Sequence, residues 1–368
     1  MEQKLILLFG FILAVLLGWF FIPGILIIAH QKHLFDLPDE RKIHAFPIPR
    51  LGGTTFFPII IFVTSVLFLL LSLYGVSSIA FFNKKNISEF LGLIAGLILL
   101  YVVGVRDDLV GVRYSRKFLV QIIAALLILA SGLYINNFYG LFGIGELPFY
   151  VGIPFTLLLT VFVTNAINLI DGIDGLASGL SIVAFTMFGF TFAIESLWMY
   201  SLLAFVCVGV LIPFFCYNVY GNVEKQHKIF MGDTGSLTLG FILSLMVIKY
   251  SMYNGEAAHS VDGAPLMTAF SMLLVPCFDV LRVVLGRLCR KAHPFKPDRT
   301  HLHHKFLDMG IKPRTSMMLI QLMAALFILA TYVLINIGVS PTVVFFLILA
   351  IWILANIGFS VVIRRRNQ

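Results

Sequence analysis

Long apolar segments, separated by short clusters of charge, Gly, Pro or Asn, follow one another along almost the whole chain of 368 residues. Segments 5–29, 56–73 and 341–362 reach the roughly 18 to 20 residues that a helix needs to cross about 30 Å of hydrocarbon. They are apolar on every face, whereas the strands of a membrane barrel would alternate apolar and polar side chains. The pattern therefore predicts an all-α polytopic integral membrane protein.

The segment boundaries predict about eleven transmembrane helices. No internal repeat or separate soluble domain interrupts the series, so residues 1–368 are expected to form a single transmembrane catalytic domain with its site on cytoplasmic loops. The helices are placed near residues 5–29, 51–74, 88–105, 117–135, 148–170, 176–194, 198–217, 234–252, 264–288, 315–337 and 341–363.

The basic residues indicate the orientation of these helices. Most of the 26 Lys and Arg residues fall in one set of loops, and cytoplasmic loops of membrane proteins are enriched in them. The opposite set carries only Lys4, Lys84, Lys85 and Lys249. We therefore expect an N-terminus outside and a C-terminus in the cytoplasm.

Composition narrows the classes of protein. Hydrophobic residues make up 60% of the chain and charged residues only 12%, whereas soluble domains carry about 25% charged residues. This excludes a soluble globular protein, a disordered chain and most proteins that read DNA, so no nucleic-acid partner is expected. The four cysteines form no CxxC pair, which argues against a zinc site or a disulfide framework.

Five aspartates lie at the predicted cytoplasmic ends of helices: Asp107, Asp108, Asp171, Asp174 and Asp233. The coupling carboxylates of a transporter are expected near the bilayer midplane instead. The distribution favours chemistry at the inner membrane surface, although an anion or nucleotide transporter remains the alternative from another class.

The adjacent Asp107 and Asp108 follow the third predicted helix directly. Neighbouring carboxylates repel each other unless a cation or a shared proton holds them, and Lys117 follows at the start of the next helix. A solvated acid pair and a basic topology anchor are the structural alternatives.

Polar residues recur every third position at Asn165, Asn168, Asp171 and Asp174. On a continuing helix, neighbours in this series would share a face, and each would cost desolvation without a partner. A glycine-ended helix terminus would explain Gly172 and Gly175 but not the aspartates, so a functional role is favoured.

A third motif, Met231-Gly-Asp-Thr-Gly-Ser236, opens the eighth predicted helix. Its aspartate, Asp233, could simply cap that helix, as could Thr234 or Ser236. Its glycines would let the backbone approach a ligand closely.

Three histidines, His301, His303 and His304, lie close together in a basic loop after Arg299. The chain lacks the spaced Cys and His ligands of a zinc site, so we interpret these side chains as donors to phosphate. We read a nearby pair, Asp279 and Arg282, as a structural contact on one helix face.

A further cytoplasmic segment at residues 39–53 combines cations with two prolines and ends in Gly52-Gly53. A basic inside loop explains its charge but not this rigid shape. We expect Lys42, His44 and Arg50 to bind substrate.

Oxygen donors from several helix ends suit Mg²⁺, which binds one or two protein groups and leaves positions for substrate phosphates. Basic loops around them suit a polyanion. Phosphoryl transfer between a cytosolic nucleotide and a lipid is the reaction class that uses all of these features.

Four motifs resemble those of the polyprenyl-phosphate N-acetylhexosamine-1-phosphate transferases, in the same order along residues 37–307. The His-Leu-His-His form is similar to the WecA/TagO-type branch, whose donor is UDP-GlcNAc, whereas the MraY-type branch tends to carry an uninterrupted histidine triplet and uses UDP-MurNAc-pentapeptide. The motifs are Val105–Asp108, Asn165–Ala177, Met231–Ser236 and His301–His304.

The resemblance implies a multi-pass protein of the bacterial inner membrane that transfers GlcNAc-1-phosphate from UDP-GlcNAc to undecaprenyl phosphate. It implies that Asp233 and Asn168 hold Mg²⁺, with Mn²⁺ as a substitute, and that Asp107 or Asp108 orients or deprotonates the lipid phosphate beside Lys117. Asp171 and Asp174 would complete the site near the nucleotide. The sugar nucleotide would be bound by Arg299, His301, His303 and His304, and Asn165 is also expected to bind substrate.

The residues leave several points open. Another donor, such as UDP-MurNAc-pentapeptide or UDP-GalNAc, would need the same chemistry. Single and double displacement, the glycan that the product initiates, such as lipopolysaccharide or teichoic acid, and the oligomeric state, a homodimer included, are undecided by sequence.

Overall fold

The computed structural model describes residues 2–36, 47–74, 84–252, 264–293 and 299–366. Helices dominate the described chain, and the two strands are only two residues long and pair antiparallel. The elements are α1 (Glu2–Gln31), β1 (Phe35–Asp36), β2 (Ile48–Pro49), η1 (Gly52–Thr55), α2 (Phe56–Tyr74), α3 (Lys84–Val110), α4 (Tyr114–Ala130), η3 (Leu141–Gly143), α5 (Phe149–Ile170), α6 (Leu176–Ile194), α7 (Trp198–Tyr220), α8 (Gly232–Ser251), α9 (Ala264–Ser271), α10 (Leu274–Cys289), α11 (Leu302–Asp308), α12 (Pro313–Asn336) and α13 (Pro341–Arg366).

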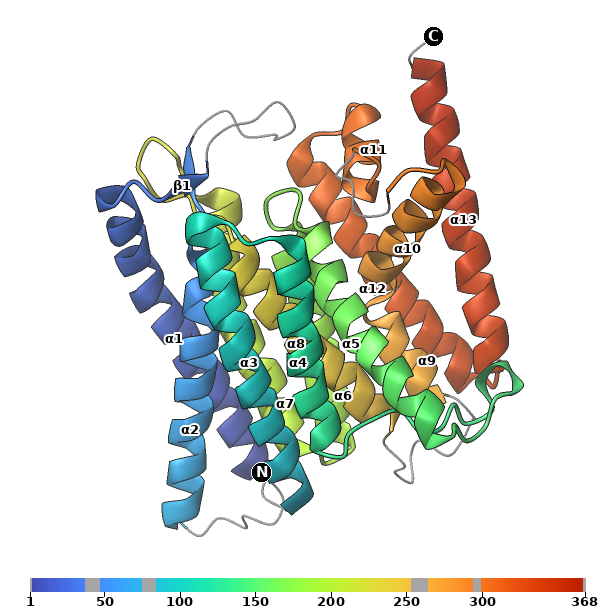
Figure 1. Cartoon of the computed structure of the whole chain (residues 1–368), viewed down its shortest axis with the longest axis horizontal. Helices are drawn as coiled ribbons and strands as arrows, with labels where there is room; N and C mark the ends of the chain where they lie inside the picture. The colour runs from blue at the N-terminus through green and yellow to red at the C-terminus, as the bar shows by residue number, and fades with distance from the viewer. Residues whose placement is uncertain (1, 37–46, 75–83, 253–263, 294–298, 367–368) are drawn as a thin grey trace.

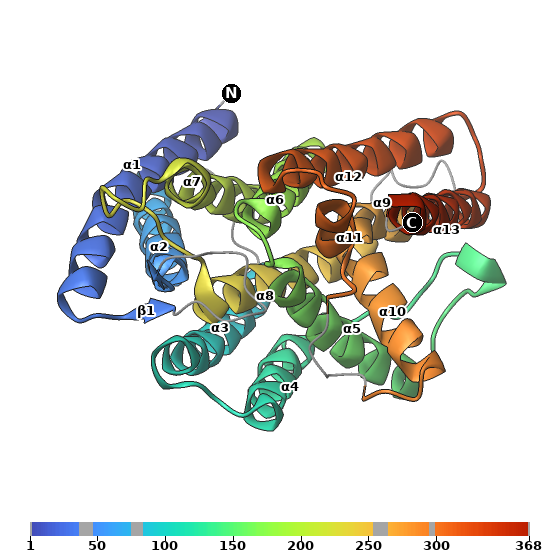
Figure 2. The ribbon, with the colours of Figure 1, turned by 90° about the horizontal axis from the view of Figure 1, so that it is seen from above.

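Helix α8 is the centre of the bundle. It lies between α3 and α5 in the view from above (Figure 2), and its side chains are buried along nearly its whole length. Helices α1 and α13 lie at the edges and bury far less of their apolar surface inside the protein. Because the exposed side chains in the middle of these two helices are mostly apolar, they fit a hydrocarbon environment.

Nine of the described helices are long and apolar enough to cross a membrane, or ten if the bent pair α9 and α10 counts as one span. This confirms the prediction of an all-α polytopic membrane protein. Helix α4 has 17 residues and runs beside α3 (Figure 1), and the two ends of the chain lie at opposite ends of the bundle.

The predicted helix at 264–288 is broken. Helices α9 and α10 meet at a bend of 77°, and Pro276 lies in the first turn of α10. Proline is tolerated there because its missing N–H needs no partner in a first turn, whereas inside a helix it removes one backbone hydrogen bond.

Small residues allow close packing at the end of α8 that carries the third motif. A Cβ added at Gly104 would lie 2.6 Å from Thr234 Cα, and one at Gly53 would overlap the backbone of Gly235. These approaches bring the end of α3 and the 3₁₀ turn η1 against the first turn of α8. Three segments that are distant in sequence therefore meet at one point.

Candidate active site

Asp108, at the end of α3, binds the first turn of α8. Its Oδ1 accepts a hydrogen bond from the Asp233 N–H at 2.7 Å, and its Oδ2 accepts from the Thr234 N–H at 3.0 Å and the Thr234 hydroxyl at 2.6 Å. A helix leaves its first N–H groups without internal partners, so this carboxylate caps α8 from another helix. A Cβ at Gly232, whose φ is +73°, would lie within 2.7 Å of both Asp108 oxygens, so only glycine fits there.

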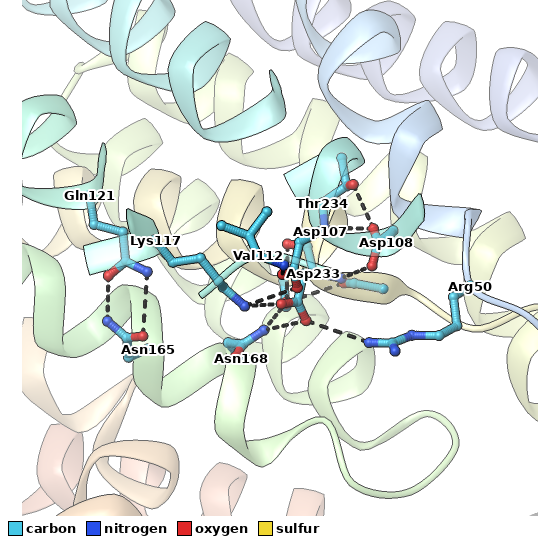
Figure 3. Close-up of polar contacts among 12 residues, drawn as sticks. Arg50, Asp107, Asp108, Val112, Lys117, Gln121, Asn165, Asn168, Asp233 and Thr234 are labelled. Atoms are coloured by element: carbon cyan, nitrogen blue, oxygen red, sulfur yellow. Dashed lines mark hydrogen bonds and ion pairs between the residues drawn. The ribbon is translucent and has the colours of Figure 1, made fainter. Parts of the chain in front are cut away.

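Asp107 lies next to Asp233, and Lys117 joins the two carboxylates (Figure 3). Lys117 Nζ donates to Asp107 Oδ2 at 3.2 Å and also to Asp233 Oδ2. The Val112 N–H donates to the other oxygen of Asp107 at 2.6 Å. One ammonium is therefore shared by two carboxylates that would otherwise repel each other.

Asp233 is also contacted from two further elements. The Asn168 amide, on α5, donates to Asp233 Oδ1 at 3.1 Å and to the Ser236 hydroxyl at 2.8 Å. The Arg50 guanidinium approaches Asp233 Oδ1 at 3.7 Å from the loop before η1. The Asp233 carboxylate is thus contacted by cationic and amide groups from segments that are far apart in the sequence (Figure 3).

The expected helical face of Asn165, Asn168, Asp171 and Asp174 does not form. Helix α5 ends at Ile170, so the two aspartates lie in the turn before α6, and Gly175 takes a φ of +75°. The helical spacing on which the expectation depended ends at Asp171, whose ψ of 57° is not helical, and Gly175 takes its positive φ without strain where α6 begins.

Asp171 is exposed to solvent, yet the protein around it reduces its hydration. This desolvation, together with the nearby Asp174 and Asp233 carboxylates, raises the pKa of Asp171 to about 7, against the opposing effect of Arg50. Asp174 forms an ion pair with Lys228 Nζ at 2.6 Å. The turn thus places a second pair of carboxylates near the first group.

The histidine motif was expected in a loop, but a short helix, α11, begins within it. The His301 ring contacts Asp279 Oδ2 through Nδ1 at 2.8 Å, and the Leu302 N–H donates to Asp279 Oδ1 at 3.0 Å. Arg282 donates to the same Oδ1 at 2.7 Å and to the Thr300 carbonyl at 2.6 Å. The predicted Asp279–Arg282 pair is confirmed, and it supports the start of α11.

His303 lies against the turn that carries Asp171. A Cβ at Gly172 would overlap His303 Nε2, and the rings of His303 and His304 have centroids 4.2 Å apart. Burial and the neighbouring His304 lower the pKa of His303 to about 3, and burial and Arg299 lower the pKa of His304. Buried in this way, His303 is neutral at pH 7, and its Nδ1 has no hydrogen-bond partner among the described residues, so it is available for a hydrogen bond rather than for a charge interaction.

Not all of the predicted site residues come together. Asn165 bonds to Gln121 and to the Val161 carbonyl instead of to a carboxylate, and Lys42 and His44 lie outside the described residues. The residues that meet around Asp233 are Arg50, Asp107, Asp108, Lys117 and Asn168.

Several residues that contact the predicted site residues were not expected from the sequence. Gln121 lies one helical turn after Lys117, a spacing that puts both on one face, and this signal could have been used. Lys228 lies three residues before the motif that begins at Met231, but nothing in the sequence shows its pairing with Asp174. The contact of Asp279 with His301 joins residues 22 positions apart and has no local signature.

Among the described residues, no group of three His, Cys, Asp or Glu side chains could hold a metal ion by protein contacts alone. The donor set around Asp233 consists of carboxylate and amide groups and so fits a hard cation that takes few protein ligands and completes its shell with phosphate and water. Asp233, Asn168 and Asp107 are the residues that could bind it.

Comparison with known proteins gives consistent matches. The model of glycosyl transferase family 4 matches residues 90–251. The probable undecaprenyl-phosphate N-acetylglucosaminyl 1-phosphate transferase of Bacillus subtilis (strain 168) is 29% identical over 358 residues, which are 95% of this chain and 91% of that protein. The undecaprenyl-phosphate alpha-N-acetylglucosaminyl 1-phosphate transferases of Yersinia pestis and Escherichia coli (strain K12) are 30% and 28% identical over 304 residues, 81% of this chain and 76% of each relative.

Proposed function

The chain belongs to glycosyl transferase family 4, and we propose that it transfers N-acetylglucosamine 1-phosphate from UDP-GlcNAc to undecaprenyl phosphate. A new bond forms between an oxygen of the lipid phosphate and the β-phosphorus of the donor. The bond from that phosphorus to the bridging oxygen breaks, and its electron pair leaves with UMP. The other product is undecaprenyl-diphosphate-GlcNAc.

The observation that carries this proposal is the cluster around Asp233. The chemical difficulty is to bring two phosphate anions together, because a phosphate monoester with a second pKa near 6 is already largely ionised at pH 7. Lys117 and Arg50 would offset negative charge at the point where the two phosphates meet. Positioning and charge neutralisation supply most of the rate in phosphoryl transfer, and this cluster offers both.

We assign the residues to roles on this basis. Asp233 and Asn168, with Asp107 beside them, would hold Mg²⁺, or Mn²⁺ in its place, and the ion would neutralise charge on the phosphates when bound. Asp107 orients the acceptor phosphate. Asp108 is a positioning residue, since all three of its hydrogen bonds go to the turn that carries Asp233.

We place the UDP-GlcNAc donor next to the turn that carries Asp171 and Asp174. His303 packs on Gly172 within this turn, and the His303 and His304 rings are in contact. Neutral imidazoles donate or accept single hydrogen bonds, which suits the sugar and phosphate oxygens of a nucleotide sugar. Arg299 adds positive charge beside His304.

The chain would cross the bacterial inner membrane eleven times if α4 and the bent pair α9 and α10 each form one crossing. The group of Asp107, Asp108, Lys117, Asn168 and Asp233, which we call the carboxylate cluster, then faces the cytoplasm, where the nucleotide sugar is available, with the N-terminus outside. The supporting observation is that the basic loops and the aspartates share one end of the bundle. Accessibility labelling of single cysteines placed at Lys4 and Arg366 would test this orientation.

A turnover assay tests the function. Purified protein should release UMP only when UDP-GlcNAc, undecaprenyl phosphate and Mg²⁺ are all present, and Asp233→Ala should abolish the release. UDP-GalNAc and UDP-MurNAc-pentapeptide assayed in parallel should turn over far more slowly. UMP release without the lipid phosphate, or full turnover by Asp233→Ala, would contradict the proposal.

A further inference from the structure

A cavity of about 1030 Å³ lies between α10, α11 and α13, and none of its described lining residues belongs to the carboxylate cluster. Figures 1 and 2 both show α10 beside α13. Ligand pockets usually have volumes of about 300–1,000 Å³, so this cavity is at the upper end. Its apolar wall comes from two membrane-spanning segments and includes Phe278, Leu281, Leu285, Trp352, Ile353 and Ile357.

The polar part of the lining is strongly basic. Five of the described lining residues are Lys or Arg and none is Asp or Glu, while Asp279, outside the lining, offsets one of these charges through Arg282. The basic residues come from the middle and the end of α10, from α11 and the segment before it, and from the last turn of α13: Arg282, Arg290, Arg299, Lys305 and Arg364.

Lys305 is the most enclosed of these cations outside the spanning helices. Its Nζ donates to the Asn356 carbonyl and side-chain oxygens and to the Ser360 hydroxyl at 3.2–3.3 Å. Burial and the Arg282 charge lower the pKa of Lys305 to about 8. An anion at this point would stabilise the charged form of a lysine that the protein alone leaves partly destabilised.

Apolar walls that end in basic groups match one chemical class, an amphiphile with an anionic head. We propose that the cavity binds an anionic glycerophospholipid of the surrounding membrane, with its phosphate among these cations and its acyl chains along α10 and α13. The acceptor substrate is the less suitable occupant, because its phosphate must reach Asp233 and no residue of the carboxylate cluster lines the cavity.

The cavity is connected to the histidine cluster through one side chain. Arg282 lines the cavity and also bonds to Asp279 and to the Thr300 carbonyl. Asp279 in turn holds His301 and the Leu302 N–H. A bound lipid head would therefore contact the same group that supports the start of α11.

Native mass spectrometry of the delipidated full chain, titrated with phosphatidylglycerol or phosphatidylcholine, tests the proposal. Arg364 and Arg365 form a matched pair, because both are exposed in the last turn of α13 but only Arg364 lines the cavity. One basic residue near a lipid head is worth roughly a fivefold change in affinity. We expect Arg364→Gln to weaken phosphatidylglycerol binding about fivefold, and Arg365→Gln to change it less than about twofold.

A second variant tests the apolar wall without changing any charge. Ile353→Trp should fill part of the cavity and weaken phosphatidylglycerol binding by a comparable factor. Equal effects of Arg364→Gln and Arg365→Gln, equal binding of phosphatidylcholine, or displacement of phosphatidylglycerol by undecaprenyl phosphate would each overturn the proposal. Because the readout is lipid binding, it does not depend on whether the protein turns over a nucleotide sugar.

Discussion

The two ends of the antiparallel helices α3 and α8 each hold a lysine against carboxylate, but in very different surroundings. At one end Lys117 joins Asp107 and Asp233. At the other, Lys249 Nζ donates to Glu89 Oε2 at 2.6 Å, and the Tyr200 hydroxyl donates to the same oxygen. The first group is the carboxylate cluster, and we call the second the Glu89–Lys249 pair.

The difference lies in charge balance and solvent access. The Glu89–Lys249 pair has one acid and one base, and the Glu89 side chain is fully buried. The carboxylate cluster has Asp108 as well, keeps 13–17% of the Lys117, Asp107 and Asp233 side chains exposed, and adjoins the exposed Asp171. A balanced, sealed pair holds helices together, whereas an acid-rich, open group has capacity left for a cation and a substrate.

The largest expected effect comes from matched amide substitutions at the two ends. Asp233→Asn should lower kcat by about 10²–10³-fold, because it removes a carboxylate that would hold the cation against the reacting phosphates. Glu89→Gln makes the same chemical change at the sealed end and should keep kcat within about tenfold. Steady-state UMP release measures both, and similar losses in both variants would erase the proposed distinction.

The free energy of unfolding should depend more on the Glu89–Lys249 pair than on the carboxylate cluster, the reverse of the effects on kcat. Lys249→Met leaves the Glu89 carboxylate buried without its ammonium partner, and breaking a buried ion pair costs about 3–5 kcal/mol. The free energy of unfolding in mixed micelles titrated with dodecyl sulfate should fall by about this amount. The double variant Glu89→Gln with Lys249→Met should recover much of the loss, and no recovery would show that the pair is not a balanced unit.

Asp108 should affect both properties, because it is a carboxylate that positions another. Asp108→Asn replaces one acceptor oxygen by a donor facing the Thr234 groups, which should cost about 1–3 kcal/mol of stability and lower kcat about 10–100-fold through a misplaced Asp233. Thr234→Val removes only the hydrogen bond from the hydroxyl, so its losses in stability and in kcat should both be smaller. If Thr234→Val lowered stability and kcat more than Asp108→Asn does, the proposal that Asp108 caps α8 would be wrong.

The smallest effect is expected at the Lys228–Asp174 ion pair. Asp174 is 36% exposed on its side chain, and such pairs contribute about 0.2–1 kcal/mol. Lys228→Gln should therefore raise the KM for UDP-GlcNAc less than about fivefold, with kcat nearly unchanged. A loss as large as that of Asp233→Asn would place Lys228 in the carboxylate cluster.

The sequence predicts well what depends on local pattern. Apolar segment length predicted an all-α polytopic membrane protein, and the aspartates that follow or open its helices include Asp107, Asp108 and Asp233, which meet in the structure. The helix break between Ser271 and Leu274 was missed because a nearby proline does not by itself mark a break: Pro23 and Pro213 lie inside continuous helices. The helical face expected at Asp171 failed because the glycine-rich turn ended the helix first.

Contacts between distant segments were not predictable in the same way. Glu89 and Lys249 are 160 positions apart, and each alone reads as a charge near a helix end. Asn165 was grouped with Asn168 by spacing, yet its partner is Gln121 on α4. The support of His301 by Asp279 depends on how α10 packs beneath α11, which local sequence does not encode.

The most direct test of the account is cation binding itself. Electron paramagnetic resonance of Mn²⁺, titrated into the purified protein in the presence of UDP-GlcNAc, reports the number and affinity of bound ions. We expect one site in the wild type and in Glu89→Gln, and at least tenfold weaker binding in Asp233→Asn, the lower end of the loss that follows removal of a site residue. Unchanged Mn²⁺ binding in Asp233→Asn, or its loss in Glu89→Gln, would contradict the assignment of the cation to the carboxylate cluster.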